Sequence, residues 1–332
     1  MVNKRSVGPA RLLNYFRITE FNISYYFMLF IIIGASIISK GIFINPDNLL
    51  ELLNRASILG MIAIGEGLVI MTAGIDLSVG AIVGLSVACM TVFLRMGINP
   101  WIIITISTAA ASLCGLVNGF IVGRTKIPPF AITLGTSLAI QSIALYIVGA
   151  GAEDMPQIVQ MIRGSAVFGH IQRFFPAMVW LLGFVVIGTL FYFTKFGISI
   201  LAIGGNEKAS KYSGIKIKNI KLFAYLISGI CCGISAFLLI YKIGGANPLA
   251  GAPYLLESIM AVVIGGIVLD GGKGNIFNVF VGSFTMVSLT NLMNLLRVDP
   301  FLQDAFKGIL LLFFIFIMGA ALRYSESRKR LT

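Results

Sequence analysis

Four ionisable residues lie within or beside long apolar stretches, where charged side chains are costly and usually functional. They are Glu66, Glu257, Asp304 and Lys307. Proton-coupled carriers use such groups as relays inside the membrane, but four scattered residues are few for that chemistry. Polar contacts on a transport path, or between helices, suit them better.

Glu66 lies in the middle of its apolar stretch, within Gly65-Glu66-Gly67. A charge at the centre of a membrane helix costs about 2.5–3.5 kcal/mol on insertion scales. Two interpretations follow for this carboxyl. It is a polar contact in a translocation path, or it faces the bundle and is protonated or hydrogen-bonded by a neighbouring helix.

The other three ionisable residues have simpler interpretations. Asp304 and Lys307 are three residues apart, so they can pair on one face of a helix. We expect that pair to be structural. Glu257 begins an apolar stretch, and we expect it to be solvated or to cap a helix.

The sequence lacks the patterns of an ATPase, a metalloprotein or a hydrolase. The run Gly271-Gly272-Lys273-Gly274 has neither the spacing nor the hydroxyl of a phosphate-binding loop. His170, the single histidine, cannot form a metal cluster alone. The cysteines lie in apolar stretches and are interpreted as packing residues: Cys89, Cys114, Cys231 and Cys232. We predict no catalytic site, no metal and no cofactor bound by this chain.

Two polar turns interrupt the apolar stretches. In Thr72–Gly80, glycine permits a sharp turn, and Asp76 or Ser78 can accept backbone N–H groups at the start of the next helix. In Ile127–Thr136, two prolines stop one element and the next helix starts at once. Thr133 and Thr136 then share a helix face, where they line a polar path or bond back to their own helix.

The third polar segment, 195–221, is a long and strongly basic loop. A chain that is otherwise almost all membrane has little reason to keep such a loop unless another protein docks there. We therefore predict a docking site, with a solvated basic connector as the alternative.

Composition identifies the elements that position these residues. The 332 residues are 58% hydrophobic and 11% charged, with a mean hydropathy of +0.95, whereas soluble domains carry about 25% charged residues. The apolar stretches approach the ~20 residues that a helix needs to cross a bilayer. We predict an all-α polytopic membrane protein with about ten transmembrane helices, near 25–40, 56–73, 78–95, 101–122, 130–149, 174–194, 221–242, 255–269, 276–293 and 301–320. A broken or re-entrant helix is an alternative near 74–78.

Lysine and arginine are concentrated on one side of these spans, including segment 195–221 and both ends of the chain. The positive-inside rule then makes both termini cytoplasmic. The predicted organisation is a cytoplasmic segment 1–24, a transmembrane domain 25–320 and a basic cytoplasmic tail 321–332. The net charge of +12 is explained by this arrangement and by contact with anionic lipid, so we expect no nucleic-acid binding.

Glycines recur every fourth residue in three spans, a spacing that lets helix backbones approach closely. The series are Gly115, Gly119 and Gly123; Gly80 and Gly84; and Gly229 and Gly233. They predict a tightly packed bundle.

Taken together and in order, the polar segments resemble the permease subunits of bacterial ATP-driven sugar importers of the ribose/galactose/xylose type. Gly74–Gly80 matches the signature Gly-Gly-Ile-Asp-Leu-Ser-Val-Gly, with Ala73 in place of the first glycine. Pro128–Thr136 matches Pro-Pro-Phe-x-x-Thr-Leu-Gly-Thr, and 202–215 and 256–266 resemble two further family motifs. Glu66 departs from the family, which usually has an uncharged residue there.

The resemblance implies a permease pair in the bacterial cytoplasmic (inner) membrane, either two copies or a copy and a paralogue. Two cytoplasmic ATP-binding-cassette ATPase modules, which use the ATP, and an external sugar-binding protein would complete the machine. It also implies that the ATPase-coupling contact is a short helix that seats in a groove of the ATPase. The residues that form or shape this helix are Gly204, Gly205, Asn206, Glu207 and Gly214. Candidate residues of the sugar path are Glu66, Asp76, Ser78, Asn118, Thr133, Thr136 and Gln141.

The main alternative is a stand-alone facilitator or secondary carrier for a small polar solute. Such carriers usually show half-chain repeats with broken helices at the midplane, and no convincing repeat is visible here. The sugar itself is not given by the sequence, and a nucleoside or a furanosyl signalling molecule is an alternative ligand.

Overall fold

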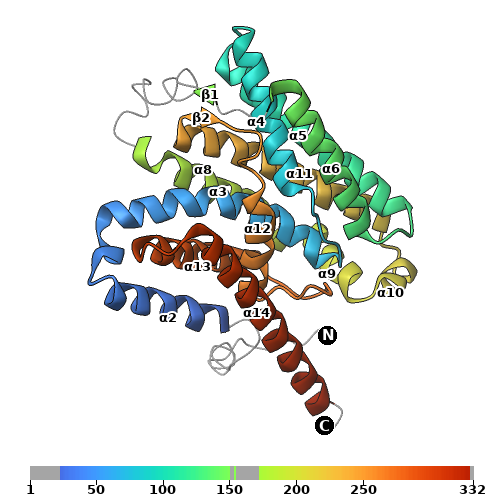
Figure 1. Cartoon of the computed structure of the whole chain (residues 1–332). Coiled ribbons are helices and arrows are strands. Elements are labelled where there is room, and N and C mark those ends of the chain that lie inside the picture. Colours follow the sequence, from blue (N-terminus) through green and yellow to red (C-terminus); the bar gives the residue numbers. More distant parts are fainter. Residues whose placement is uncertain (1–22, 150–152, 155–171, 330–332) are drawn as a thin grey trace.

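The computed structural model describes residues 23–149, 153–154 and 172–329 (Figure 1). This part of the chain is a bundle of helices with one pair of two-residue strands, β1 and β2, joined antiparallel through Glu153↔Ala246 and Asp154↔Gly245. The predicted all-α class is confirmed. The elements are α2 (Ile23–Ile38), η1 (Ile42–Ile44), α3 (Pro46–Met71), α4 (Val79–Arg95), α5 (Pro100–Arg124), α6 (Pro129–Val148), β1 (Glu153–Asp154), η2 (Gln172–Phe174), α8 (Phe175–Phe193), α9 (Lys195–Gly205), α10 (Glu207–Tyr212), α11 (Ile217–Ile243), β2 (Gly245–Ala246), α12 (Pro253–Ile264), α13 (Ile276–Leu295) and α14 (Pro300–Lys329).

Each of the ten predicted spans falls on a helix, but not all of these helices have the length of a full span. Among the described residues, seven helices are long and apolar enough to cross a membrane. The helices α2, α4 and α12 are shorter, with 16, 17 and 12 residues. A 12-residue helix is about 18 Å long, against ~30 Å of hydrocarbon. The predicted span 255–269 was too long because α12 ends at Ile264, followed by Gly265 as its C-cap and by Gly266 at φ +84°.

Asparagine–proline pairs start two of the long helices. Asn45 caps α3 by accepting a hydrogen bond from the Asp47 amide (3.0 Å), and Asn99 caps α5 through the Trp101 amide (2.9 Å). In both helices proline follows as the first helical residue, where its missing N–H is not needed. These local signals fix where the spans begin.

The helices form a buried centre and an apolar outer layer. In the most apolar 18 residues of α3, 83% are buried inside the protein, whereas only 11% are buried in those of α14. At the centre α3 and α11 run antiparallel, since Ser235 Oγ donates to the Ile58 carbonyl (2.9 Å) while Lys242 pairs with Glu51 (2.8 Å). Large apolar side chains of α5, α6, α8 and α14 are exposed, as lipid-facing helices require.

The glycine series predicted a tightly packed bundle. Helices α5 and α11 do pack closely, at the glycines of two of these series. A Cβ at Gly115 would clash with the Tyr225 carbonyl and lie 3.1 Å from Gly229 Cα, and one at Gly119 would lie 2.8 Å from Leu222 Cα. A Cβ at Gly233 would in turn lie 2.7 Å from Thr108 Cα. The two backbones touch because neither has side chains at these positions.

The bundle has two ends, named here by what they carry. The β end carries β1 and β2, with the starts of α3, α5 and α14, and the α9 end carries α9, α10 and the turns 72–78 and 265–275 (Figure 1). Two non-helical segments run inside the bundle. Segment 72–78 joins α3 to α4, and segment 244–252 packs on α4, where a Cβ at Gly80 would lie 2.7 Å from the Gly251 carbonyl oxygen.

Replacing Gly115 by valine should destabilise the bundle. The added side chain overpacks the α5–α11 contact, at a cost of about 1–3 kcal/mol or more. Gly135→Val on α6 is the matched control, because a Cβ there meets nothing within 4 Å. The midpoint of thermal unfolding in detergent should fall for Gly115→Val only. Equal midpoints for the two variants would contradict the packing described for α5 and α11.

Candidate functional site

Five of the predicted path residues come together in one buried polar cluster. The Asp76 amide donates to Glu66 Oε1 (3.2 Å), and Ser78 donates to Asp76 Oδ1 from its amide (2.9 Å) and its hydroxyl (2.5 Å). Asn118 Nδ2 donates to Ser78 Oγ (2.8 Å). Thr133 Oγ1 accepts from the Leu77 amide (3.0 Å). All five predicted residues are buried.

Segment 72–78 builds this cluster by leaving the helix and turning back into the protein. Helix α3 ends at Met71, and Ala73 follows with φ +60°, a left-handed conformation that ends helices. The chain then returns to the level of Glu66, one to two turns back along α3. Thr133 fixes it there, since its hydroxyl also donates to the Ile75 carbonyl (3.0 Å).

Several oxygens of this region have no hydrogen-bond partner within the described protein. They are Glu66 Oε2, Asn118 Oδ1 and Tyr225 OH. The Ser228 hydroxyl faces Asp76, and the Tyr225 hydroxyl lies against Gly74. No lysine or arginine is among the buried residues of the described chain. The cluster therefore combines two carboxyl groups with neutral polar groups only.

The remaining two predicted path residues lie outside the cluster. Thr136 donates back to the Thr133 carbonyl of its own helix (3.1 Å). Gln141 lies near segment 244–252, where its Nε2 donates to the Pro248 carbonyl (3.4 Å). The path role of all seven residues stays a prediction, and the five in the cluster line no open cavity in this conformation because they are fully covered.

Segment 195–221 is largely helical, so the expectation of a loop was wrong in part, and α10 (Glu207–Tyr212) is a short helix of the kind that the resemblance implied. Thr194 caps α9 through the Phe196 amide (3.1 Å), and Asn206 caps α10 through the Ala209 amide (2.9 Å). Helix α11 then begins at Ile217, four residues earlier than predicted. Gly204 and Gly205 form the last turn of α9, and Gly214 follows α10 at φ +80°.

The α9–α10 element is exposed on one side and anchored on the other. Glu207 is exposed and pairs with Lys221 of α11 (2.6 Å), and Tyr212 is 91% exposed. On the inner side a Cβ at Gly204 would clash with the Met71 carbonyl and the Gly272 amide. Gly272 N–H in turn donates to the Met71 carbonyl (3.0 Å). Three backbone segments thus meet directly, and we name this contact of Met71, Gly204 and Gly272 the glycine junction.

A pocket of ≈ 300 Å³ lies at the β end, between α3, α11, α12 and α13. Arg55, Lys242, Tyr254, Glu257 and Thr290 provide its polar lining, and Leu59 is among its apolar residues. We name it the β-end pocket. The junction of segment 244–252 with α12 lines one side of the pocket, through Ala250, Pro253 and Tyr254. Helix α12, which starts there, is too short to span the membrane.

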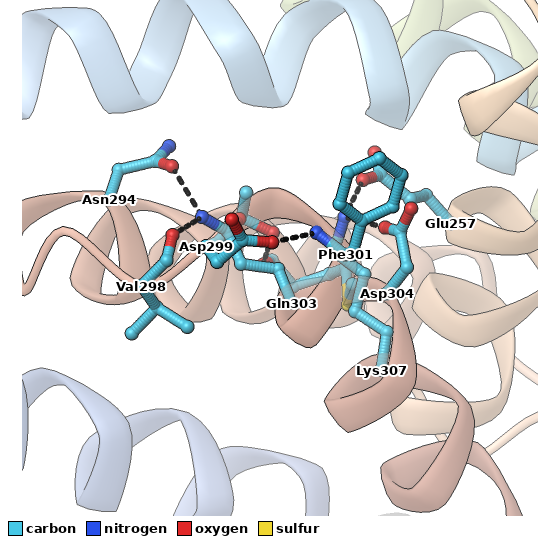
Figure 2. A network of polar contacts seen from close by, with 10 residues as sticks. Glu257, Asn294, Val298, Asp299, Phe301, Gln303, Asp304 and Lys307 are labelled. Carbon is cyan, nitrogen blue, oxygen red and sulfur yellow. Dashed lines mark hydrogen bonds and ion pairs between the residues drawn. The ribbon is translucent and has the colours of Figure 1, made fainter.

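The ionisable residues of α14 are tied to this pocket. Lys307 pairs with Glu257 of α12 (2.6 Å) and with Asp304 (3.3 Å), so the predicted Asp304–Lys307 pair is confirmed. The expectation of a solvated Glu257 was wrong, because its side chain is only 16% exposed and its partner comes from α14. Figure 2 shows this network beside the start of α14, where Gln303 Nε2 donates to Asn294 Oδ1 (3.0 Å).

Comparisons with known proteins agree with this architecture. Residues 48–315 match the family described as branched-chain amino acid transport system / permease component. The chain is 36% identical over 290 residues to the ribose import permease protein RbsC of Bacillus subtilis (strain 168), covering 86% of this chain and 88% of that relative. It is 31% identical over 294 residues to the D-allose transport system permease protein AlsC of Escherichia coli (strain K12), covering 86% and 88%. It is 33% identical over 293 residues to the fructose import permease protein FrcC of Rhizobium meliloti, covering 85% and 80%. No solved structure matches the chain.

The chain belongs to this permease family. The resemblance seen in the sequence is therefore confirmed, and it covers the helices that build the polar cluster, the glycine junction and the β-end pocket. The N-terminal basic residues and His170 lie outside the described residues.

Sequence reasoning missed several residues of this permease. Tyr225 and Ser228 belong to an apolar helix, and only the neighbouring Gly229 of the glycine series pointed to their face of α11. Lys242, Tyr254 and Thr290 come from α11, α12 and α13, and no motif in the sequence indicates that these three residues lie close together. Their convergence follows from segment 244–252, which carries α12 into the bundle.

Glu66→Gln should leave the stability of this permease nearly unchanged, because the amide keeps the shape of the carboxyl without a buried charge. Asp76→Ala should lower stability by about 1–3 kcal/mol, since the amide and hydroxyl of Ser78 lose their shared acceptor. Both variants are measured by thermal unfolding of the purified permease. An unchanged midpoint for Asp76→Ala would show that the Asp76–Ser78 contacts do not hold segment 72–78.

Proposed function

We propose that this chain is the membrane-spanning permease subunit of an ATP-binding-cassette importer that moves a monosaccharide into the cell. The observation that supports the transport class is membership of a permease family over most of the chain. The sugar is supported by relatives named for ribose, D-allose, fructose and galactose import. ATP is hydrolysed by a separate subunit, and this chain provides the path and the mechanical coupling.

In this proposal the chain crosses a bacterial cytoplasmic membrane with ten helical segments. The three short helices α2, α4 and α12 complete the set, and the non-helical segments 72–78 and 244–252 are tolerated because they are buried in protein. Both termini and the α9 end are cytoplasmic, as the positive-inside rule requires. The β end then faces the outside, where it meets the sugar-binding protein.

The α9–α10 element is the proposed seat of the ATPase. Asn206 and Glu207 start a short exposed helix whose position is fixed by the Glu207–Lys221 pair. The glycine junction fixes the end of α9 against the turns that follow α3 and α12. Movement of a docked ATPase would therefore reach Asp76, five residues beyond Met71, through the backbone itself.

The proposed path passes the polar cluster, which is closed in this conformation. Opening it requires α3, α5 and α6 to separate at Glu66, Asn118 and Thr133. The unpaired oxygens of the cluster would then face the passing solute, whose hydroxyl groups can satisfy them. A second permease copy or a paralogue completes the path on the other side, and membrane lipid covers the exposed apolar faces of α5, α6, α8 and α14.

Purification from the native membrane tests this proposal. An ATP-binding-cassette ATPase and an exported sugar-binding protein should co-purify with the permease and be identified by mass spectrometry. In proteoliposomes the complex should take up sugar only with ATP on the ATPase side. Uptake by the permease alone, without ATP, would instead identify a facilitator.

Glu207→Lys should uncouple this transporter. The substitution breaks the pair with Lys221 and places two positive charges together on the docking face. We expect normal membrane insertion and ATP-dependent sugar uptake reduced at least tenfold. The control is the exchange variant Glu207→Lys with Lys221→Glu, which restores an ion pair and the net charge at the same place and should recover uptake. Normal uptake by Glu207→Lys would contradict the docking role of α9–α10.

A further inference from the structure

The β-end pocket contains more polar side chains than a gap between membrane helices requires. Tyr254 and Glu257 come from the start of α12, Arg55 from α3, Lys242 from α11 and Thr290 from α13. Small-molecule sites combine an apolar lining with a few polar groups that converge from different elements. Leu59, Pro253 and Val287 provide that apolar lining.

The charges around the pocket are already paired within the protein. Glu51 Oε1 accepts from Arg55 Nε (2.7 Å) and from Lys242 Nζ (2.8 Å). Lys307 holds Glu257 and Asp304. The cations Arg55, Lys242 and Lys307 are thus balanced by the anions Glu51, Glu257 and Asp304. A charged ligand would have to compete with these internal partners, whereas a neutral ligand can use the hydrogen-bonding positions that remain.

The pairs also hold the side chains in place before a ligand arrives. Glu257 is held by a lysine whose own side chain is only 11% exposed, and α14 is held in turn by the Gln303 contacts shown in Figure 2. Arg55 and Glu257 line the same pocket as Tyr254. Side chains fixed in this way lose little conformational freedom on binding.

Size and shape favour a single sugar ring. The volume of ≈ 300 Å³ is at the lower end of the range of about 300–1,000 Å³ for small-molecule sites. A ring of carbon atoms with hydroxyl groups presents an apolar face to an aromatic side chain and its hydroxyl edge to charged groups. Tyr254, with the neighbouring Arg55 and Glu257, offers that combination.

We propose that the β-end pocket is a binding site for one neutral monosaccharide, held between Tyr254 and the charged side chains of Arg55 and Glu257. Each of these two charges has its own partner in the protein, Glu51 for Arg55 and Lys307 for Glu257. The inference rests on the proposed function, because it places the sugar at the external end of the path. Leu59 lies at the pocket and Glu66 follows seven residues later, two turns along the same face of α3. On this proposal the sugar binds in the pocket before it reaches the closed polar cluster.

Protection of a cysteine from labelling tests the site directly. Thr290→Cys is introduced into a variant whose four native cysteines are replaced by serine, and the chain is expressed with its partner subunits in membrane vesicles. A membrane-impermeant thiol reagent is applied with D-ribose, D-allose, D-fructose or D-galactose, or with L-valine. At least one sugar should slow labelling threefold or more, L-valine should not, and Tyr254→Ala should remove the protection.

Asn54→Cys is the matched control, because Asn54 is next to Arg55 on α3 but lines a different pocket. Its labelling should be unaffected by every sugar. The proposal is overturned if Thr290→Cys is not labelled, if no sugar protects it, if L-valine protects it equally, or if protection survives Tyr254→Ala.

Sugar uptake measured in the same vesicles separates this inference from the proposed function. ATP-dependent uptake without protection overturns the pocket alone. Absence of ATP-dependent uptake for every sugar, with the binding protein present, overturns the importer itself.

Discussion

The backbone contact between Met71, Gly204 and Gly272 joins the exposed part of this permease to its buried part. The Gly272 amide donates to the Met71 carbonyl (3.0 Å), and Gly204 lies so close to both that no side chain fits between them. A contact made by backbone atoms has no rotamers to absorb a displacement, and packed interfaces transmit small shifts because they are not continuously deformable. We therefore expect the α9–α10 element and segment 72–78 to move together.

This connection gives a physical role to the broken helices. A backbone that leaves the helix inside a membrane must find other hydrogen-bond partners, and segment 72–78 finds them in Glu66, Thr133 and its own Asp76. Glu66 belongs to α3 and Thr133 to α6, while Asp76 lies in the segment itself, just before α4. A shift of the segment consequently changes contacts of α3, α4 and α6 at once. The same logic applies to segment 244–252, which brings the start of α12 to the β-end pocket.

Much of this fold could be predicted from the sequence, because hydropathy reports which segments prefer lipid. The ten apolar stretches all became helices, and the glycine spacing predicted a tightly packed bundle, which the contact of α5 with α11 shows. The end of α12 was missed because Gly265 and Gly266 are apolar by composition yet stop a helix by backbone conformation. The polar composition of segment 195–221 suggested a loop because Gly204 and Gly205 also suit a turn, and only the short helix implied by the resemblance was expected. In the structure the Asn206 cap separates two helices.

The site was predicted less completely, since contacts across the fold leave little signal in one sequence. Asp76 and Ser78 were found through their turn, but the contact of Ser78 with Asn118 joins residues forty positions apart. Glu257 was expected in solvent because its partner, Lys307, lies fifty residues later. Tyr225 and Tyr254 look like ordinary aromatic residues of membrane helices, and only the packing of α11 and α12 gives them their positions.

The central claim, that the glycine junction couples an ATPase to the path, is tested most directly by two adjacent alanine substitutions. A Cβ at Gly204 collides with backbone atoms, whereas one at Gly205 has 4.0 Å to its nearest neighbour, Gly272 Cα. Sugar uptake and ATP hydrolysis are measured together in the reconstituted complex. We expect Gly204→Ala to retain hydrolysis while uptake per ATP falls at least tenfold, and Gly205→Ala to match the unsubstituted complex. Equal uptake per ATP in both variants would contradict the coupling role of the junction.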